Sequence, residues 1–181
     1  KIGTFKINII ASSIQIIQGI IQKIYIKAKD INYKDLFFDE VELEAKDVKI
    51  IFKISNKELK FKNNFIIKFK ISLSEDSLQK VLSSSNWDWV GDLISKEILN
   101  QSKLEDIRIE NNQILIKTSK EKESINAMEK VDIKVESGKL YLENKAYNKS
   151  IKIPIENKVF FKDVNIKNNL ISIFAKSSID F

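Results

Sequence analysis

The chain has 181 residues, 43% of them hydrophobic, and its 31 lysine and arginine residues against 25 acidic ones give a net charge of +6. It contains no histidine and no cysteine, which excludes histidine-dependent catalytic triads, imidazole metal sites, disulfides and thiolate chemistry. Arg108 is the only arginine, whereas nucleic-acid recognition depends on arginine forks. We therefore expect neither an enzyme nor a nucleic-acid-binding module.

The lysine surplus has two explanations. It suits a surface that tolerates anionic membranes, and an AT-rich genome produces the same bias toward Ile, Lys and Asn. The length predicts one domain over residues 1–181, because no linker rich in Gly, Pro or Ser divides it. No run of about 18 apolar residues occurs, so we expect no membrane-spanning helix. The first residue is Lys1, which leaves open an upstream signal peptide or anchor.

Alternation of apolar and polar residues predicts strands over most of the first 73 residues. These strands are expected at residues 5–9, 20–29, 41–54 and 59–73, with a turn at 55–57. Between the first two strands, Ile14 and Ile17 at helical spacing, followed by Gly19, predict a short helix. In the third strand the apolar positions move from odd to even numbers at Lys46–Asp47, which predicts a β-bulge and a curved sheet.

The stretch from Leu73 to Ser102 differs from the rest of the chain because its apolar residues recur every three or four positions. This spacing predicts one long amphipathic helix. Ser74 suits its N-cap, and Glu75 in the first turn meets the positive end of the helix dipole. The weak helix formers at 83–86 predict a kink or a two-part helix, with Asn86 as the cap of the second part.

The second half of the chain again predicts strands separated by short turns. The expected turns are Asn111–Asn112, Ser137–Gly138 and Asn168–Asn169. Pro154 suits an edge strand. The segments DIRIENNQI from Asp106 and DVNIKNNLI from Asp163 are similar, either as two copies of one β unit or as two hairpins built from the same residue types. The residues alone thus predict an α+β fold, an antiparallel β domain with one long helix.

The candidate ligand-binding residues lie on the apolar side of the predicted helix. They are Leu78, Val81, Leu82, Trp87, Trp89, Leu93, Ile94 and Ile98. The two tryptophans either fill the core or border a lipid-filled cleft or membrane interface. Phe37 and Phe38 are candidates for a membrane-contacting tip, with core burial as the alternative. No glycine-rich phosphate loop or calcium loop occurs, so we predict no catalytic residue, metal or cofactor.

The order of these features resembles the LmeA-like phospholipid-binding family. The segments that carry the resemblance are IIQGIIQKIYIKAKDI from Ile16, FFDEVELEAKDVKI from Phe37, LSEDSLQKVL from Leu73 and IPIENKVFFKDVNIKNNLI from Ile153. The third matches the family's helix start, L-T-x-x-D-L-N, with Ser74, Ser77 and Gln79 in place of its threonine, aspartate and asparagine.

This resemblance implies a fold similar to the tubular lipid-binding proteins related to bactericidal/permeability-increasing protein, in which a strongly curved antiparallel sheet wraps a long helix. It implies a phospholipid or other acyl ligand in an apolar groove between helix and sheet, held without chemistry, for lipid transfer or cell-envelope maintenance. It also implies a location in the envelope or at the membrane periphery of a bacterium, with cyanobacteria among the hosts. The alternative is a membrane-proximal structural or protein-interaction domain with a fully packed core.

Overall fold

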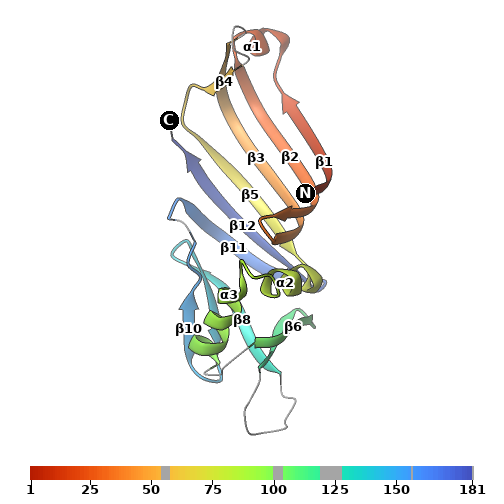
Figure 1. Ribbon diagram of the computed structural model, residues 1–181. Coiled ribbons are helices and arrows are strands. Elements are labelled where there is room, and N and C mark those ends of the chain that lie inside the picture. The colour runs from red at the N-terminus through yellow and green to blue at the C-terminus, as the bar shows by residue number, and fades with distance from the viewer. Residues whose placement is uncertain (54–57, 100–103, 119–127, 156, 181) are drawn as a thin grey trace.

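The computed structural model describes residues 1–53, 58–99, 104–118, 128–155 and 157–180, and strands make up most of them (Figure 1). The strands are β1 (Ile2–Ile10), β2 (Ile20–Tyr33), β3 (Leu36–Lys53), β4 (Glu58–Phe61), β5 (Phe65–Leu73), β6 (Leu104–Glu110), β7 (Gln113–Thr118), β8 (Glu129–Glu136), β9 (Lys139–Asn144), β10 (Lys149–Lys152), β11 (Val159–Lys167) and β12 (Leu170–Ile179). The helical segments are α1 (Ser13–Ile17), α2 (Glu75–Leu82), α3 (Asp88–Leu93) and the π-helical turn η1 (Ile94–Ile98). The turn predicted at 55–57 and the predicted helix end at 100–102 lie outside the described residues.

Over the described residues the strands form two antiparallel sheets. The larger has seven strands in the order β1-β2-β3-β5-β12-β11, with β4 paired to β3, and the smaller has the order β10-β9-β8-β7-β6. In Figure 1 the larger sheet forms the upper part of the molecule, the smaller sheet the lower part, and α2 and α3 lie where they meet. The predicted antiparallel β-sheet is confirmed, as are the turns at 111–112, 137–138 and 168–169.

The prediction of one long helix wrapped by a strongly curved sheet is wrong. The helical stretch breaks after α2, as its weak helix formers at 83–86 predicted, and continues only as α3 and η1. Asn86 does not cap α3, because its side-chain amide donates to Asp35 at 2.6 Å and the N-cap residue is Trp87, whose side chain makes no capping hydrogen bond. These short segments lie at one end of the larger sheet instead of running along it (Figure 1).

The start of α2 connects the two sheets through hydrogen bonds. Ser74 is the N-cap, as predicted, and its Oγ accepts the N–H of Ser77 at 3.3 Å. Asp39 of β3 accepts both the N–H and the hydroxyl of Ser74, at 2.6 and 2.9 Å. On the other side, the Glu75 carboxylate accepts the N–H of Ile109 in β6 at 2.8 Å. One helical turn is therefore bonded to a strand of each sheet.

Two other local predictions have different outcomes. The short helix ended by Gly19 is confirmed, because α1 ends at Ile17 and Gly19 has a φ of +71°. The β-bulge at Lys46–Asp47 is not found between β2 and β3, whose register continues unchanged across it. Asp47 instead has a φ of +54°, and Ala45 and Val48 pack into the same buried cluster on either side of it.

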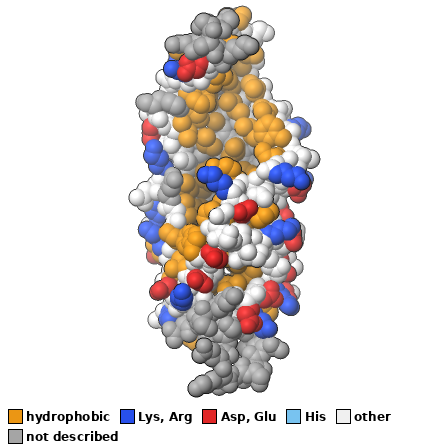
Figure 2. All heavy atoms as spheres, in the orientation of Figure 1, with side chains coloured by type: hydrophobic (Ala, Val, Ile, Leu, Met, Phe, Trp, Pro, Cys, Tyr) orange, Lys and Arg blue, Asp and Glu red, His pale blue; other side chains and the backbone are white. Residues whose placement is uncertain are grey.

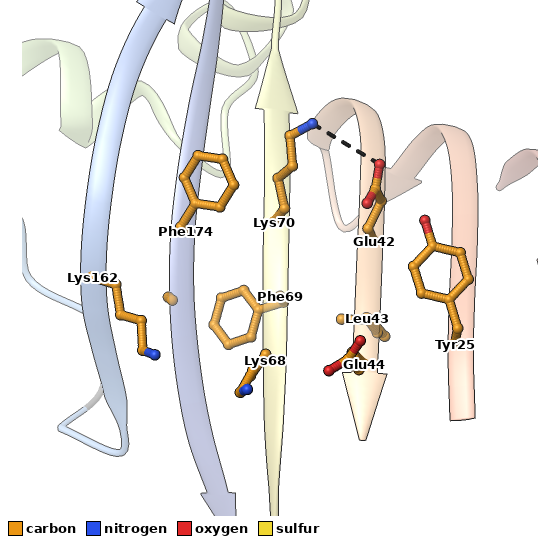
Figure 3. Close-up of a pocket in the computed structure, with 10 residues that line it drawn as sticks. Tyr25, Glu42, Leu43, Glu44, Lys68, Phe69, Lys70, Lys162 and Phe174 are labelled. Atoms are coloured by element: carbon orange, nitrogen blue, oxygen red, sulfur yellow. Dashed lines mark ion pairs between the residues drawn. The ribbon is translucent and has the colours of Figure 1, made fainter. Parts of the chain in front are cut away.

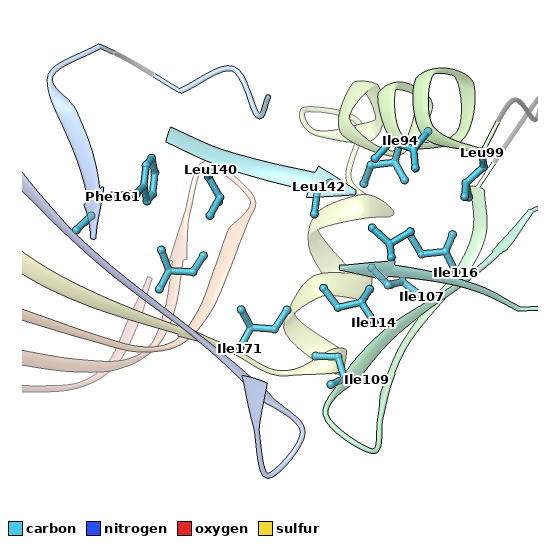
Figure 4. Packing of buried hydrophobic residues seen from close by; sticks show 14 residues of the cluster. Ile94, Leu99, Ile107, Ile109, Ile114, Ile116, Leu140, Leu142, Phe161 and Ile171 are labelled. Atoms are coloured by element: carbon cyan, nitrogen blue, oxygen red, sulfur yellow. The ribbon is translucent and has the colours of Figure 1, made fainter. Parts of the chain in front are cut away.

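A main core of buried apolar side chains fills the space between the helices and both sheets (Figure 4). It consists of Ile94, Ile98, Leu99, Ile107, Ile109, Ile114, Ile116, Val131, Leu140, Leu142, Phe161, Ile171, Ile173 and Ala175. The two similar hairpins of the sequence also meet, since Asn112 and Asn169 in their turns exchange backbone-to-side-chain hydrogen bonds at 3.4 and 3.3 Å. The core is thus shared by both sheets.

We expect Asp39→Ala to lower the free energy of unfolding by about 1–3 kcal/mol, because it leaves the half-buried N–H and hydroxyl of Ser74 without their acceptor. Ser74→Ala should lower it by about 1 kcal/mol through loss of the N-cap. The double variant should lose less stability than the sum of the two single losses, since both single variants remove the hydrogen bond between the Asp39 carboxylate and the Ser74 hydroxyl. Urea unfolding of the two single variants and the double variant measures this coupling, and strictly additive losses would contradict it.

Candidate functional site

The larger sheet has one apolar face and one charged face, and the strand register determines which residues share a face. Residues directly opposite each other in adjacent strands point to the same side of a sheet. One such row crosses the whole sheet and contains only apolar residues. The row consists of Ile7, Ile26, Leu43, Phe69, Ala175 and Phe161.

Neighbouring rows extend the apolar face in both directions along the strands. On one side lie Phe5, Ala28, Val41, Ile71, Ile173 and Val164, and on the other lie Ile9, Ile24, Ala45, Ile67, Ser177 and Val159. Ser177 is the one polar side chain in these three rows. A ligand on this face would therefore meet hydrocarbon almost everywhere.

The helices and the smaller sheet cover only one end of the apolar face. Near α2, Leu73 packs on the main core and Ile171 is part of it. Toward β1 and the opposite end, Phe5, Ile7 and Ile9 are between 48% and 57% exposed. We call this part the open face. It comprises the exposed Phe5, Ile7 and Ile9 and the half-buried Ile24, Ile26, Leu43 and Ile67, of which Ile24 and Ile67 also pack against a second buried cluster. Figure 2 shows hydrophobic side chains gathered in a hollow above the helices.

The open face is long as well as apolar. β1 follows it from Phe5 to Ile9, which at roughly 3.3 Å per residue is about 13 Å. One leaflet of a bilayer has a hydrocarbon depth of about 15 Å, half of the whole core. The open face is therefore nearly as long as the acyl region of one leaflet is deep.

The opposite face of the larger sheet is charged, and its side chains pair across strands. Lys27 Nζ lies 2.7 Å from the Glu40 carboxylate and 3.1 Å from that of Glu42. Lys70 reaches Glu42 at 4.0 Å (Figure 3). Glu42 and Lys70 line an open hollow of about 290 Å³. The hollow is also lined by Tyr25, Leu43, Glu44, Lys68, Phe69, Lys162, Phe174 and Ala175.

The surroundings of Lys27 and Tyr25 on the charged face raise the pKa of both groups. Hydrogen bonds to Glu40 and Glu42 raise the pKa of Lys27 to about 12. Burial, reinforced by a hydrogen bond to Glu42, raises the pKa of Tyr25, so its phenol stays protonated at neutral pH. A charged ammonium and a neutral phenol beside ionised carboxylates stabilise the sheet surface and are poor nucleophiles.

Four of the eight predicted helical site residues line one apolar cavity. Ile94 and Ile98 belong to the main core, and Leu78 and Leu82 pack against it. A cavity of about 150 Å³, lined only by apolar residues, includes Leu78, Val81, Leu82 and Ile94 in its wall. Ligand pockets usually measure about 300–1,000 Å³, so this cavity is too small for an acyl chain.

The predicted aromatic candidates lie near the helices, and none is buried. Trp87 is half-buried and its indole N–H donates to the carbonyl of Lys34 at 2.9 Å, while Trp89 is 42% exposed, with the two rings 6.1 Å apart. Leu93 is half-buried beside them. Phe37 and Phe38 are half-buried in β3 opposite Asn32 and Ile31, at the end of the β2–β3 hairpin next to its turn at 34–35. Membrane contact by these two phenylalanines stays a prediction.

Sequence reasoning identified the strands of the open face but did not select their residues as a site. Phe5, Ile7 and Ile9 were recognised only as one side of a half-buried strand, and Ile24 and Ile26 as another. The amount of apolar surface on the predicted strands could have identified them as the site. Four strands present apolar sides of this length, whereas the predicted helix offers one narrow stripe that covers only part of such a surface.

Among the described residues, no group of three or more carboxylates is placed to hold a metal ion. Within the same residues, no helix is long and apolar enough to cross a membrane. Comparisons with family models, curated proteins and solved structures find no match to this chain. The resemblance to the LmeA-like family therefore stays a prediction.

We expect the stability of the protein to fall in acid because of the charged face. Burial acts to raise the pKa of Glu42, but its hydrogen bonds to neighbouring side chains, Lys27 among them, outweigh burial and lower the pKa. A hydrogen bond to Lys23 likewise lowers the pKa of Glu44. A carboxylate with a lowered pKa contributes stability above its unfolded pKa of about 4.3 and loses it as the pH falls through the folded value.

The urea midpoint should therefore drop steeply between pH 5 and pH 2, and Glu42→Gln should make that drop shallower. Far-UV circular dichroism at a series of pH values measures both midpoints. Equal acid dependence in Glu42→Gln and in the unchanged protein would show that this carboxylate does not contribute.

Proposed function

We propose that the protein binds the acyl chains of a lipid, a phospholipid foremost, on the open face and does not alter them chemically. The observation that carries this proposal is an exposed sheet face whose cross-strand rows are almost wholly apolar. Contiguous exposed apolar surface of this kind marks a binding site, because a monomeric soluble protein rarely leaves it uncovered.

The chemistry of the face favours a hydrocarbon chain over other ligands. A sugar, nucleotide or peptide needs hydrogen-bonding groups at defined positions, since polar groups that lose water without a partner are costly. The open face offers side chains such as Ile7, Ile26 and Leu43, and the strands use their own N–H and C=O groups in pairing. An acyl chain needs only such a surface. The resemblance to the LmeA-like family points to the same ligand class.

The energy of such binding favours a lipid with two chains. Complete burial of a methylene gains about 0.8 kcal/mol, and contact with an open sheet covers roughly half of each methylene. Ten methylenes of one chain then gain about 4 kcal/mol, which corresponds to a dissociation constant near 1 mM. Two parallel chains double this gain. The face extends over β1, β2, β3 and β5, which gives room for two chains.

The alternative, a membrane-proximal interaction domain with a fully packed core, receives less support. The main core is packed around the helices and the smaller sheet, but Phe5, Ile7 and Ile9 lie outside it and are exposed. A role in lipid transfer or envelope maintenance, at the envelope or membrane periphery of a bacterium, would follow from acyl-chain binding and rests on the resemblance.

A fluorescent fatty-acid probe titrated into the protein tests the proposal. We expect Ile7→Lys to reduce probe affinity about tenfold or more, because it places a charge in the middle of the open face, where hydrocarbon would contact it. Ile7 is already half exposed, so the substitution should leave the fold intact, which circular dichroism verifies.

Asn8→Lys is the matched control. It introduces the same charge one residue along β1, where alternation points the side chain to the opposite face beside Tyr25. Probe affinity should stay unchanged in this variant. Failure of the unchanged protein to bind the probe, or equal losses in both variants, would contradict binding on the open face.

A further inference from the structure

α1 and β4 lie at the end of the larger sheet farthest from α2 and α3 (Figure 1). Several apolar side chains at this end are exposed. In α1, Ile14, Ile16 and Ile17 are 68%, 60% and 87% exposed. On the adjoining strands, Phe52 of β3 and Leu59 of β4 pair with each other and are both more than half exposed. We call these five residues the apolar tip.

In water a surface helix normally turns its polar side chains outward and its apolar ones inward, and α1 has the opposite arrangement. Its three isoleucines face outward, whereas Gln15 is half-buried and turns back, so that its Oε1 accepts the N–H of Ser12 at 2.8 Å. Ser12 Oγ accepts the N–H of Gln15 at 3.3 Å in return. The polar side chains thus satisfy backbone groups and the apolar ones face the surroundings. This arrangement suits a segment in hydrocarbon, where unpaired backbone groups are especially costly.

The apolar tip is held in place by the sheet beneath it. The carbonyl of Gly19 accepts the N–H of Ile50 in β3 at 2.7 Å. Gly19 has a φ of +71°, and a Cβ at this position would lie 2.1 Å from the Ile50 carbonyl oxygen. Only glycine allows so close an approach, so the isoleucines are presented on a fixed turn and little ordering is needed on binding.

Charge around the apolar tip complements an anionic surface. Residues 11–19 carry no charge, whereas the adjoining segments 48–52 and 58–62 contain three lysines and one glutamate, Glu58. Lys49, Lys60 and Lys62 are all exposed. An uncharged apolar protrusion with lysines behind it matches the layering of a bilayer, in which anionic headgroups lie above hydrocarbon.

We propose that the apolar tip inserts into the boundary between headgroups and acyl chains of a bilayer that contains anionic phospholipid. Ile9 and Ile24 of the open face continue from the larger sheet toward α1. A lipid leaving the bilayer at the tip would therefore stay on apolar surface until it lies on the open face. This route rests on the proposed function, whereas the docking itself does not.

Co-sedimentation with vesicles of phosphatidylcholine and phosphatidylglycerol in equal parts tests the docking. The unchanged protein should bind these vesicles and bind pure phosphatidylcholine vesicles more weakly. Replacement of Ile14, Ile16 and Ile17 by serine should lower vesicle partitioning by at least about tenfold, because highly exposed side chains lose their transfer into hydrocarbon. Ile155→Ser is the control, since Ile155 is exposed but follows β10 at the smaller sheet.

A site-specific label gives a second readout that does not depend on partitioning alone. Because the chain has no cysteine, Ile17→Cys and Ile155→Cys each provide a unique attachment point for an environment-sensitive fluorophore. On addition of the mixed vesicles, the label at position 17 should shift to shorter wavelength and the label at position 155 should not. Absence of vesicle binding by the unchanged protein, full binding by the triple serine variant, or a shift at position 155 only would overturn the inference.

The acyl-probe titration separates this inference from the proposed function. The triple serine variant should still bind the probe, and Ile7→Lys should still bind vesicles. If the apolar tip proves necessary for vesicle binding while the unchanged protein binds no probe, membrane docking stands and acyl-chain binding on the open face fails. If the probe binds but serine substitution at the tip leaves vesicle binding unchanged, the reverse holds.

Discussion

The structure depends on one constraint, which is that strict alternation in paired strands places every second side chain on the same face of a sheet. In the larger sheet this puts rows such as Ile7, Ile26, Leu43 and Phe69 on one side and the paired lysines and glutamates on the other. The chain supplies enough helix and second sheet to cover only one end of the apolar side. A second buried cluster around Ala45, Val48 and Phe65 occupies part of the remainder, and Phe5, Ile7 and Ile9 stay exposed. The proposals for function concern this exposed part of the apolar side.

The helical stretch from α2 to η1 connects the two sheets and covers one end of the apolar face of the larger sheet. Ser74 is bonded to Asp39 of the larger sheet and Glu75 to the backbone of Ile109 in the smaller one. Behind this turn, Ile94 and Ile98 belong to the main core, which contains a small apolar cavity. A longer helix would have lain along the sheet and filled the hollow in which the open face lies.

The main core, the charged face and the exposed apolar surface have separate physical roles. The main core provides stability, the charged face keeps one side of the sheet in water, and the open face together with the apolar tip presents hydrocarbon to the surroundings. A site of this kind binds by surface transfer and shape, with affinity that grows with the apolar area covered. The pairing of Lys27 with Glu40 and Glu42 shows how the charged groups on the opposite face are already occupied with one another.

The sequence by itself determined the strands, most of their turns, the N-cap at Ser74, the break at 83–86 and the stop at Gly19, because each follows from residues close together in the chain. It also indicated an apolar ligand class through the resemblance. Only the tertiary structure decided that the helices stay short and cap one end, and that Phe5, Ile7 and Ile9 remain uncovered while Ile98 is buried. Burial depends on which distant segments meet, and the periodicity of Phe5, Ile7 and Ile9 is the same whether a partner covers them or not.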